Sequence, residues 1–138
     1  MAFEQTLTTQ AKYIALQYLA TGTLKMALYT AEADLTASTL VYTTTNEISG
    51  TGYTAGGKTL TVSQVPIING TTPPTAYISF SNVTWTAALT ARGALIYKSG
   101  SGNPTVCVLD FGNDKTSTTT FTVQFPAATD TSAIIRLS

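Results

Sequence analysis

The most suggestive chemistry in this sequence is a phosphate-binding pattern in a glycine-rich stretch. The segment Gly52 to Thr59 matches G-x-x-x-x-G-K-[ST] at every fixed position. In a P-loop, backbone amides hold the phosphates, the lysine reaches the β- and γ-phosphates, and the hydroxyl binds magnesium. Lys58 and Thr59 would take the last two roles, and Asp110, after the apolar run Val106 to Leu109, could hold the magnesium ion. The pattern therefore raises an NTPase hypothesis.

The residues around this stretch argue against a nucleotide site. A P-loop must open a helix, because the helix N-terminus supplies free amides and a favourable dipole for the anion. Lys58 leads instead into an alternating strand pattern that Pro66 stops. The segment Gly50 to Ala55 matches the dinucleotide pattern G-x-G-x-x-A, and it lacks a following helix in the same way. We therefore predict that the chain binds no nucleotide cofactor.

Other catalytic or metal-binding arrangements lack the residues they need. The chain has no histidine and one cysteine, Cys107, which excludes His-based triads, an intrachain disulfide and metal sites built on Cys or His. Glu32 with Asp34 could bind a cation weakly, and Asp110 with Asp114 could form a carboxylate pair. Solvated loops and turn formation explain both pairs better. We predict no catalytic, cofactor or metal site, and a protein that is not an enzyme.

The clearest structural signal is a β-hairpin between Arg92 and Phe111. Two apolar runs, Ala94 to Tyr97 and Val106 to Phe111, flank a segment of Ser, Gly, Asn and Pro. The second run is apolar on both faces, which is typical of a strand at the centre of a core. We therefore expect this hairpin in the middle of a β domain, with Cys107 buried as a small apolar side chain.

One helix is predicted, over Thr9 to Ala20, with Thr8 or Thr9 as N-cap and Gly22 just after its end. Its core-facing residues recur with helical spacing: Ala11, Ile14, Ala15, Tyr18 and Leu19. Tyr13 and Leu16 add apolar area on a second side, although one apolar face is enough to cover a sheet. Two interpretations stay open: the helix lies only on a sheet, or Tyr13 and Leu16 also meet a neighbouring subunit.

Short alternating patterns predict about eight strands in all. Besides the two strands of the central hairpin they cover residues 23–30, 58–65, 76–80, 120–125 and 133–137. Residues 40–44 are a candidate short strand, and residues 83–87 are either a strand or an extended loop. Asn69-Gly70 is a strong hairpin signal, with Pro66, Pro73 and Pro74 around it. The pattern indicates an all-β fold, an antiparallel β-sandwich or jelly-roll-like barrel with one short N-terminal α-helix. Without a linker or repeat, residues 1–138 are expected to form a single domain.

The composition limits the partners of the chain. Only 10% of the residues are charged, and seven basic residues balance seven acidic ones, whereas about 25% is usual. No basic stretch could follow a phosphate backbone, so nucleic acid is not an expected partner. A neutral, Thr-rich surface has little charge repulsion between copies and suits packing against other proteins. The alternative is a monomer that happens to be rich in threonine.

No targeting or membrane-spanning segment is visible. Residues 1–10 lack a basic region followed by an apolar one, so no signal peptide is expected. No apolar run approaches the ~18 residues of a membrane span. We therefore expect synthesis in a cytoplasm and no membrane partner.

Several stretches resemble a family of small virion proteins of tailed bacteriophages. They are the segment from Leu24 to Thr61, ARGALIYKS, VLDFGNDKT and the terminal AIIRLS. The resemblance covers most of the chain, from about Leu24 to Leu137. Members of this family are virion components, so the resemblance implies a structural protein of the particle. It carries over no catalytic residue and does not say which part of the particle is involved.

Three functions are consistent with these observations. The first is a capsid decoration or cement protein, a homotrimer that contacts the major capsid protein, made in the bacterial cytoplasm and located in the virion. The second is a neck, tail or fibre-associated protein of the same particle. The third is a carbohydrate- or receptor-binding module, with Trp85 and Tyr53 as candidate stacking residues, although a tryptophan is more often part of a core.

Overall fold

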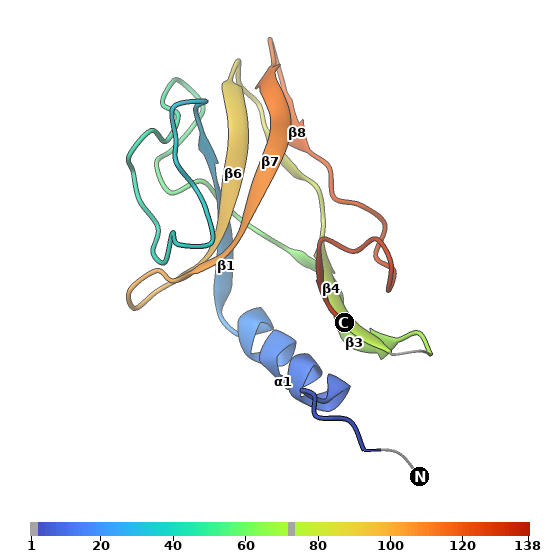
Figure 1. Cartoon of the computed structure of the whole chain (residues 1–138). Coiled ribbons are helices and arrows are strands. Elements are labelled where there is room, and N and C mark those ends of the chain that lie inside the picture. The colour runs from blue at the N-terminus through green and yellow to red at the C-terminus, as the bar shows by residue number, and fades with distance from the viewer. Residues whose placement is uncertain (1–2, 72–73) are drawn as a thin grey trace. The chain divides into compact units, whose positions relative to one another are not determined.

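The structure is a computed structural model that describes residues 3–71 and 74–138 (Figure 1). Its elements are α1 (Thr9–Ala20), β1 (Thr23–Tyr29), β2 (Lys58–Thr59), β3 (Val62–Asn69), β4 (Thr75–Phe80), β5 (Val83–Trp85), β6 (Thr90–Ser99), β7 (Thr105–Thr116), β8 (Phe121–Val123) and β9 (Ile135–Leu137). All strand pairs in the described ranges are antiparallel, and their sheets do not close into a barrel. The predicted all-β antiparallel fold with one short helix is confirmed, in its sandwich form.

The chain forms two compact units, each built from separate segments. The first unit contains the described residues up to Thr21, those of Val62–Ser81, and Phe125–Ser138. The second contains Gly22–Thr61 and Asn82–Gln124. The first unit has one β-sheet and the second has two, and each unit has its own buried side chains. The single domain expected for residues 1–138 stays a prediction.

In the first unit, α1 packs on a three-stranded sheet of order β3-β4-β9. The Thr8 side chain accepts a hydrogen bond from the backbone N–H of Ala11 at 3.3 Å, which confirms Thr8 as the N-cap. The helix begins at Thr9 and ends at Ala20, as predicted. Every residue of β4 is buried, because this strand lies between β3 and β9.

The helix buries a different face from the predicted one. Leu16 is fully buried, whereas Ile14 is 54% and Tyr18 is 68% exposed. Tyr13, three positions before Leu16, is half-buried. The prediction that Ile14 and Tyr18 face the core and that Leu16 is spare is therefore wrong. Apolar residues occupy both sides of α1, so the helical period alone could not show which side meets the sheet.

The predicted strand over residues 58–65 is two strands that belong to different sheets. β2 pairs with β1, whereas β3 pairs with β4. β3 continues through Pro66, because the register shifts between Gln64 and Ile67 and an irregularity of this kind tolerates a residue without an N–H. The hairpin signal at Asn69-Gly70 is confirmed by the β3–β4 pair, while Pro73 lies outside the described residues.

The second unit contains a four-stranded sheet of order β2-β1-β6-β7 and a two-stranded sheet of β5 and β8. β1 and β6 are its central strands, paired from Thr23↔Ser99 to Tyr29↔Gly93. Their side chains fill the core on both faces of the sheet: Met26, Ala27, Leu28, Ala94, Leu95 and Ile96 have no exposed area. The smaller sheet adds the buried residues Trp85 and Phe121, whose rings meet edge to face.

The hairpin of β6 and β7 is confirmed, but the wrong strand was predicted to be central. β7 pairs with β6 and with no other strand in the described part of the chain. Its residues from Val106 to Phe111 are half-buried or exposed, and Cys107 is half-buried where full burial was predicted. Apolar residues on both faces do not reveal which strand of a hairpin has a neighbour on each side.

The segment predicted as a strand over residues 40–44 is a loop that covers the start of β7. Its only ladder contact among the described residues is an isolated bridge between Val41 and Pro104. The Thr105 N–H donates to the Leu40 carbonyl at 3.1 Å, and the Thr105 hydroxyl donates to the Thr39 carbonyl at 2.6 Å. The strands predicted near residues 83–87, 120–125 and 133–137 are present as the shorter β5, β8 and β9.

Candidate functional site

The segment that matches the P-loop pattern does not have the structure of a P-loop. Lys58 and Thr59 form β2, so a strand and not a helix follows the glycines. The Lys58 ammonium donates to the Thr84 carbonyl at 2.5 Å and lies 5.8 Å from the centroid of the Trp85 ring. Its charge is thus directed to a carbonyl and an aromatic face. That the chain binds no nucleotide stays a prediction.

A close approach of two backbones explains one glycine of this pattern. Gly57 has a φ of +79°, and a Cβ built on it would lie 1.7 Å from the Met26 carbonyl oxygen of β1. Both the left-handed backbone and the missing space require glycine here. Gly57 is therefore a packing residue, where the loop before β2 crosses β1.

Four tyrosines surround one glutamate in the second unit, and we call these five residues the tyrosine–glutamate cluster: Tyr29, Tyr42, Glu47, Tyr53 and Tyr97. The Tyr42 hydroxyl donates to Glu47 Oε1 and the Tyr53 hydroxyl to Glu47 Oε2, both at 2.5 Å. The same Oε2 accepts the Gly56 N–H at 2.8 Å. One carboxylate thus gathers three donors from the loop between β1 and β2.

Further hydrogen bonds tie this loop to the sheet below it. The Tyr97 hydroxyl of β6 donates to the Gly56 carbonyl at 2.6 Å, and the Tyr29 hydroxyl of β1 donates to the Thr43 carbonyl at 2.7 Å. The Tyr53 hydroxyl also accepts the Leu28 N–H at 3.0 Å. The rings of Tyr42 and Tyr97 are stacked, with centroids 4.6 Å apart. The cluster therefore joins loop and sheet by hydrogen bonds as well as by packing.

Burial raises the pKa of all four phenols above the usual tyrosine value. For Tyr42 and Tyr53 the second cause is the hydrogen bond that each donates to Glu47, because this bond requires the neutral phenol. For Tyr29 and Tyr97 the second cause is the nearby charge of Glu47. The phenols therefore stay protonated at neutral pH.

The cluster has the geometry of a structural clamp. Each phenol has one proton to donate, and all four protons go to acceptors within the cluster or the adjacent loop. Sequence reasoning missed this group. Its members are spread from residue 29 to residue 97, and only the path of the loop over the sheet brings them together.

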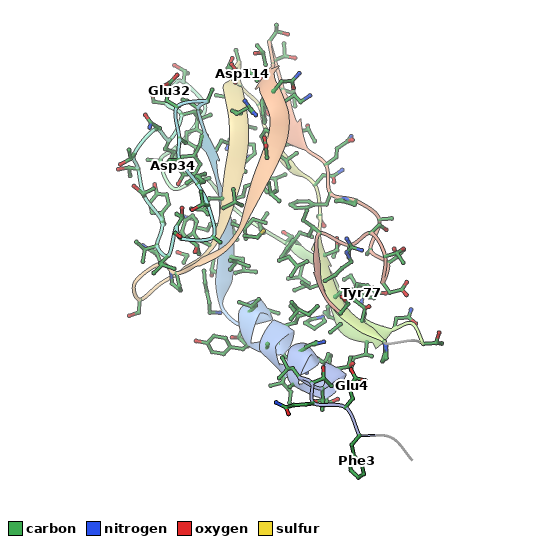
Figure 2. All side chains as sticks on the ribbon, in the orientation of Figure 1. Phe3, Glu4, Glu32, Asp34, Tyr77 and Asp114 are labelled. Carbon is green, nitrogen blue, oxygen red and sulfur yellow. The ribbon has the colours of Figure 1, made fainter. Side chains whose placement is uncertain are left out.

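The two acidic pairs considered in the sequence lie on the surface of the second unit. Glu32 and Asp34 are exposed in the loop after β1, and Asp114 is exposed near the end of β7 (Figure 2). Asp110 accepts the Gly112 N–H at 2.8 Å and the Arg92 Nε–H at 3.3 Å, and both bonds lower the pKa of its carboxyl. In the described part of the chain, no three His, Cys, Asp or Glu side chains gather as a metal site.

The candidate stacking residues are not on the surface. Trp85 is 1% exposed and Tyr53 is 8% exposed, with ring centroids 6.1 Å apart. A sugar cannot stack on a ring that is already covered on both faces. Their candidate role as stacking residues is therefore contradicted. Both residues belong to the core, which is the commoner place of a tryptophan.

The largest hollow among those found on the second unit lies between β7 and β8, with a volume of about 530 Å³. Two others, near Arg92 and near Cys107, measure about 230 and about 300 Å³. We call the first one the β7–β8 groove, and its lining is Phe111, Lys115, Thr116, Ser117, Thr120, Phe121, Thr122, Val123 and Gln124. Among these residues Phe121 and Val123 are buried, whereas Thr116, Thr120 and Thr122 are exposed.

Comparisons with known proteins do not identify the chain. No family model, no curated protein and no solved structure matches it. Among the described residues, no helix is both long and apolar enough to cross a membrane.

Proposed function

We propose that this protein is a structural component of a tailed-phage virion, a capsid decoration or cement protein that acts through protein–protein contacts. It forms a homotrimer and binds the major capsid protein. The resemblance of the segments between Leu24 and Leu137 to small phage virion proteins supports this role. The structural roles of the candidate functional residues support it as well. The tyrosine–glutamate cluster holds a loop, Lys58 belongs to a strand, and Trp85 and Tyr53 belong to the core.

The observation that carries the proposal is a set of exposed apolar side chains on a surface with few charges. Six of them belong to the first unit, on α1, on β3 and on the segment before the helix: Phe3, Leu7, Ile14, Tyr18, Val65 and Ile67. Single exposed apolar residues are ordinary, but several on neighbouring elements are typical of an interaction surface. With 10% charged residues, the chain offers little repulsion to a protein partner.

The helix contributes the clearest pair of these residues. Ile14 and Tyr18 are four positions apart, so they lie next to each other on the exposed side of α1. We expect this pair, and not Tyr13 with Leu16, to meet the shell. The test is made on phage particles from which the gene has been deleted, to which purified protein is added back.

Wild-type protein should bind the particles, raise the temperature at which the shell opens, and appear as trimeric density on the capsid in a cryo-EM map. Ile14→Asp with Tyr18→Asp should reduce binding by at least about tenfold. Leu40→Asp is the matched control, because Leu40 is 72% exposed in the second unit. Density at the neck, tail or fibre would assign the protein to those structures instead. No density on any part of the particle would refute the virion role.

A further inference from the structure

The segment that precedes α1 presents apolar side chains without packing them. Residues 3–8 form no helix or strand and are all exposed, with Phe3 at 91% and Leu7 at 63% exposure. Figure 2 shows Phe3 at the far end of this segment, pointing away from α1. In an extended chain alternate residues share a face, so Phe3 and Leu7 would lie on one side and Glu4 on the other. The segment thus has the pattern of a strand that lacks a sheet.

The β7–β8 groove offers apolar side chains and a free strand edge to such a segment. Its lining contains two aromatic residues, Phe111 and Phe121, whose ring centroids are 6.4 Å apart. β8 pairs with β5 and with no other strand in the described ranges, so its second edge has backbone groups available to an added strand. A volume of about 530 Å³ leaves room for apolar side chains of the size of phenylalanine and leucine.

The charges of residues 3–8 and of the β7–β8 groove are also complementary. Lys115 is the one charged residue in the lining of the groove, and Glu4 is the one charged residue in residues 3–8. Asp114 precedes Lys115 in the chain but is not part of the lining. A segment with one negative charge therefore fits a groove with one positive charge, and an acidic residue in the groove would oppose it.

We propose that residues 3–8 of one copy bind in the β7–β8 groove of a second copy. The segment lies beside β8 as an added strand, with Phe3 against Phe111 and Glu4 near Lys115. A second copy is the fitting occupant because the net charge is zero, which leaves no long-range repulsion between copies. The inference deepens the proposed function, since it supplies the contact that holds copies together.

The first test exchanges the two charges. Sedimentation of the full chain measures self-association of the wild type, Glu4→Lys, Lys115→Glu and the double variant. Each single change should weaken self-association about threefold, and the double variant should recover it, as expected for a partly exposed ion pair. Phe3→Ala should weaken it by at least about tenfold, whereas Leu40→Ala should change it less than about twofold.

The second test reads the contact directly by cross-linking. In a Cys107→Ser background, one preparation carries Glu4→Cys and a second carries Lys115→Cys. Mild oxidation of the mixture should form disulfide-linked dimers containing one chain of each kind, and Phe3→Ala in the first preparation should remove them. Equal amounts of homodimer in each separate preparation would indicate random collision and overturn the proposal.

The remaining outcomes separate this inference from the proposed function. A chain that carries both cysteines and closes an intrachain disulfide at all concentrations would show that the segment binds its own groove, which refutes the second copy. Self-association unaffected by Phe3→Ala and by the charge exchange would also refute it. Neither result bears on binding to particles, which is measured separately on the capsid with the Ile14 and Tyr18 variant.

Discussion

Glu47 is the residue on which the path of the loop between β1 and β2 depends. Its two carboxylate oxygens accept hydrogen bonds from Tyr42, Tyr53 and the Gly56 N–H. A polar group left without a partner in a buried position costs about 1–3 kcal/mol, more than a hydrogen bond contributes when formed. Removing this one acceptor should therefore destabilise the whole loop.

Glu47→Ala should lower the free energy of unfolding by about 3 kcal/mol, because it leaves two phenols and an amide without their acceptor. Glu47→Gln should cost about 1 kcal/mol, since the amide keeps one acceptor oxygen and a phenol can accept from its nitrogen. Urea unfolding measures both. Glu32→Gln, at an exposed position, is the control and should stay within about 0.5 kcal/mol. A Glu47→Ala effect as small as the control would contradict the clamp.

Gly57 and Gly102 allow backbone strain to be separated from a steric clash. Their φ angles are +79° and +76°, but a Cβ at Gly57 would meet Met26 whereas a Cβ at Gly102 would meet nothing within 4 Å. Gly102→Ala should therefore lower the free energy of unfolding by about 1 kcal/mol, because it introduces backbone strain without a steric clash. Gly57→Ala should cost about 3 kcal/mol or more, because β1 or the loop must move. Equal decreases in the free energy of unfolding for the two variants, measured with urea, would mean that the loop does not cross β1 so closely.

At the scale of elements, α1 illustrates how a helix with apolar residues on two sides is oriented. Leu16 occupies the fully buried position, and Ile14 and Tyr18 are left exposed. Thr8 and the helix bounds followed from local chemistry, because a cap and a period depend on near neighbours. The orientation depends on which stripe fits the surface of β3 and β4.

Leu16→Ala should lower the free energy of unfolding by about 3 kcal/mol, because it removes a buried side chain and leaves a cavity. Ile14→Ala deletes a similar volume from an exposed position and should cost less than about 1 kcal/mol. Thermal and urea unfolding followed by circular dichroism compare the two. If Ile14→Ala were the more damaging change, the orientation of α1 described here would be wrong.

At the scale of the whole molecule, the stability of the second unit should depend on alkaline pH. The folded state raises the pKa of Tyr29, Tyr42, Tyr53 and Tyr97 above the unfolded value of about 10. Their stabilising contribution is fully present below pH about 10 and is lost as the pH rises toward the folded values, because the unfolded chain then releases protons that the folded chain keeps.

In a Cys107→Ser background, which removes a thiol whose pKa burial also raises, urea midpoints should therefore be constant from pH about 8 to about 9.5 and fall at higher pH. Tyrosinate absorbance from the cluster should appear together with unfolding and not before it. Tyr53→Phe should make the fall of the urea midpoint less steep, because it removes one phenol whose pKa is raised in the folded state. Ionisation of the cluster tyrosines in a chain that remains folded would show that the cluster is open to water.

The sequence by itself determined the local features of this protein. The helix bounds, the β6–β7 and β3–β4 hairpins and the antiparallel class all follow from periodicity, caps and turn residues, which act over a few positions. It also showed that Lys58 leads into a strand. Histidine-based chemistry was excluded by composition alone.

Only the tertiary structure decided which of these elements lie inside. β6 is central and β7 is at the edge because β1 pairs with β6, a neighbour that no local pattern in either strand reveals. The burial of Leu16 and of Trp85 likewise depends on surfaces distant in sequence. Glu47 lies among its tyrosines because the loop between β1 and β2 crosses the sheet. The hydrogen bonds that hold this loop join residues up to 66 positions apart.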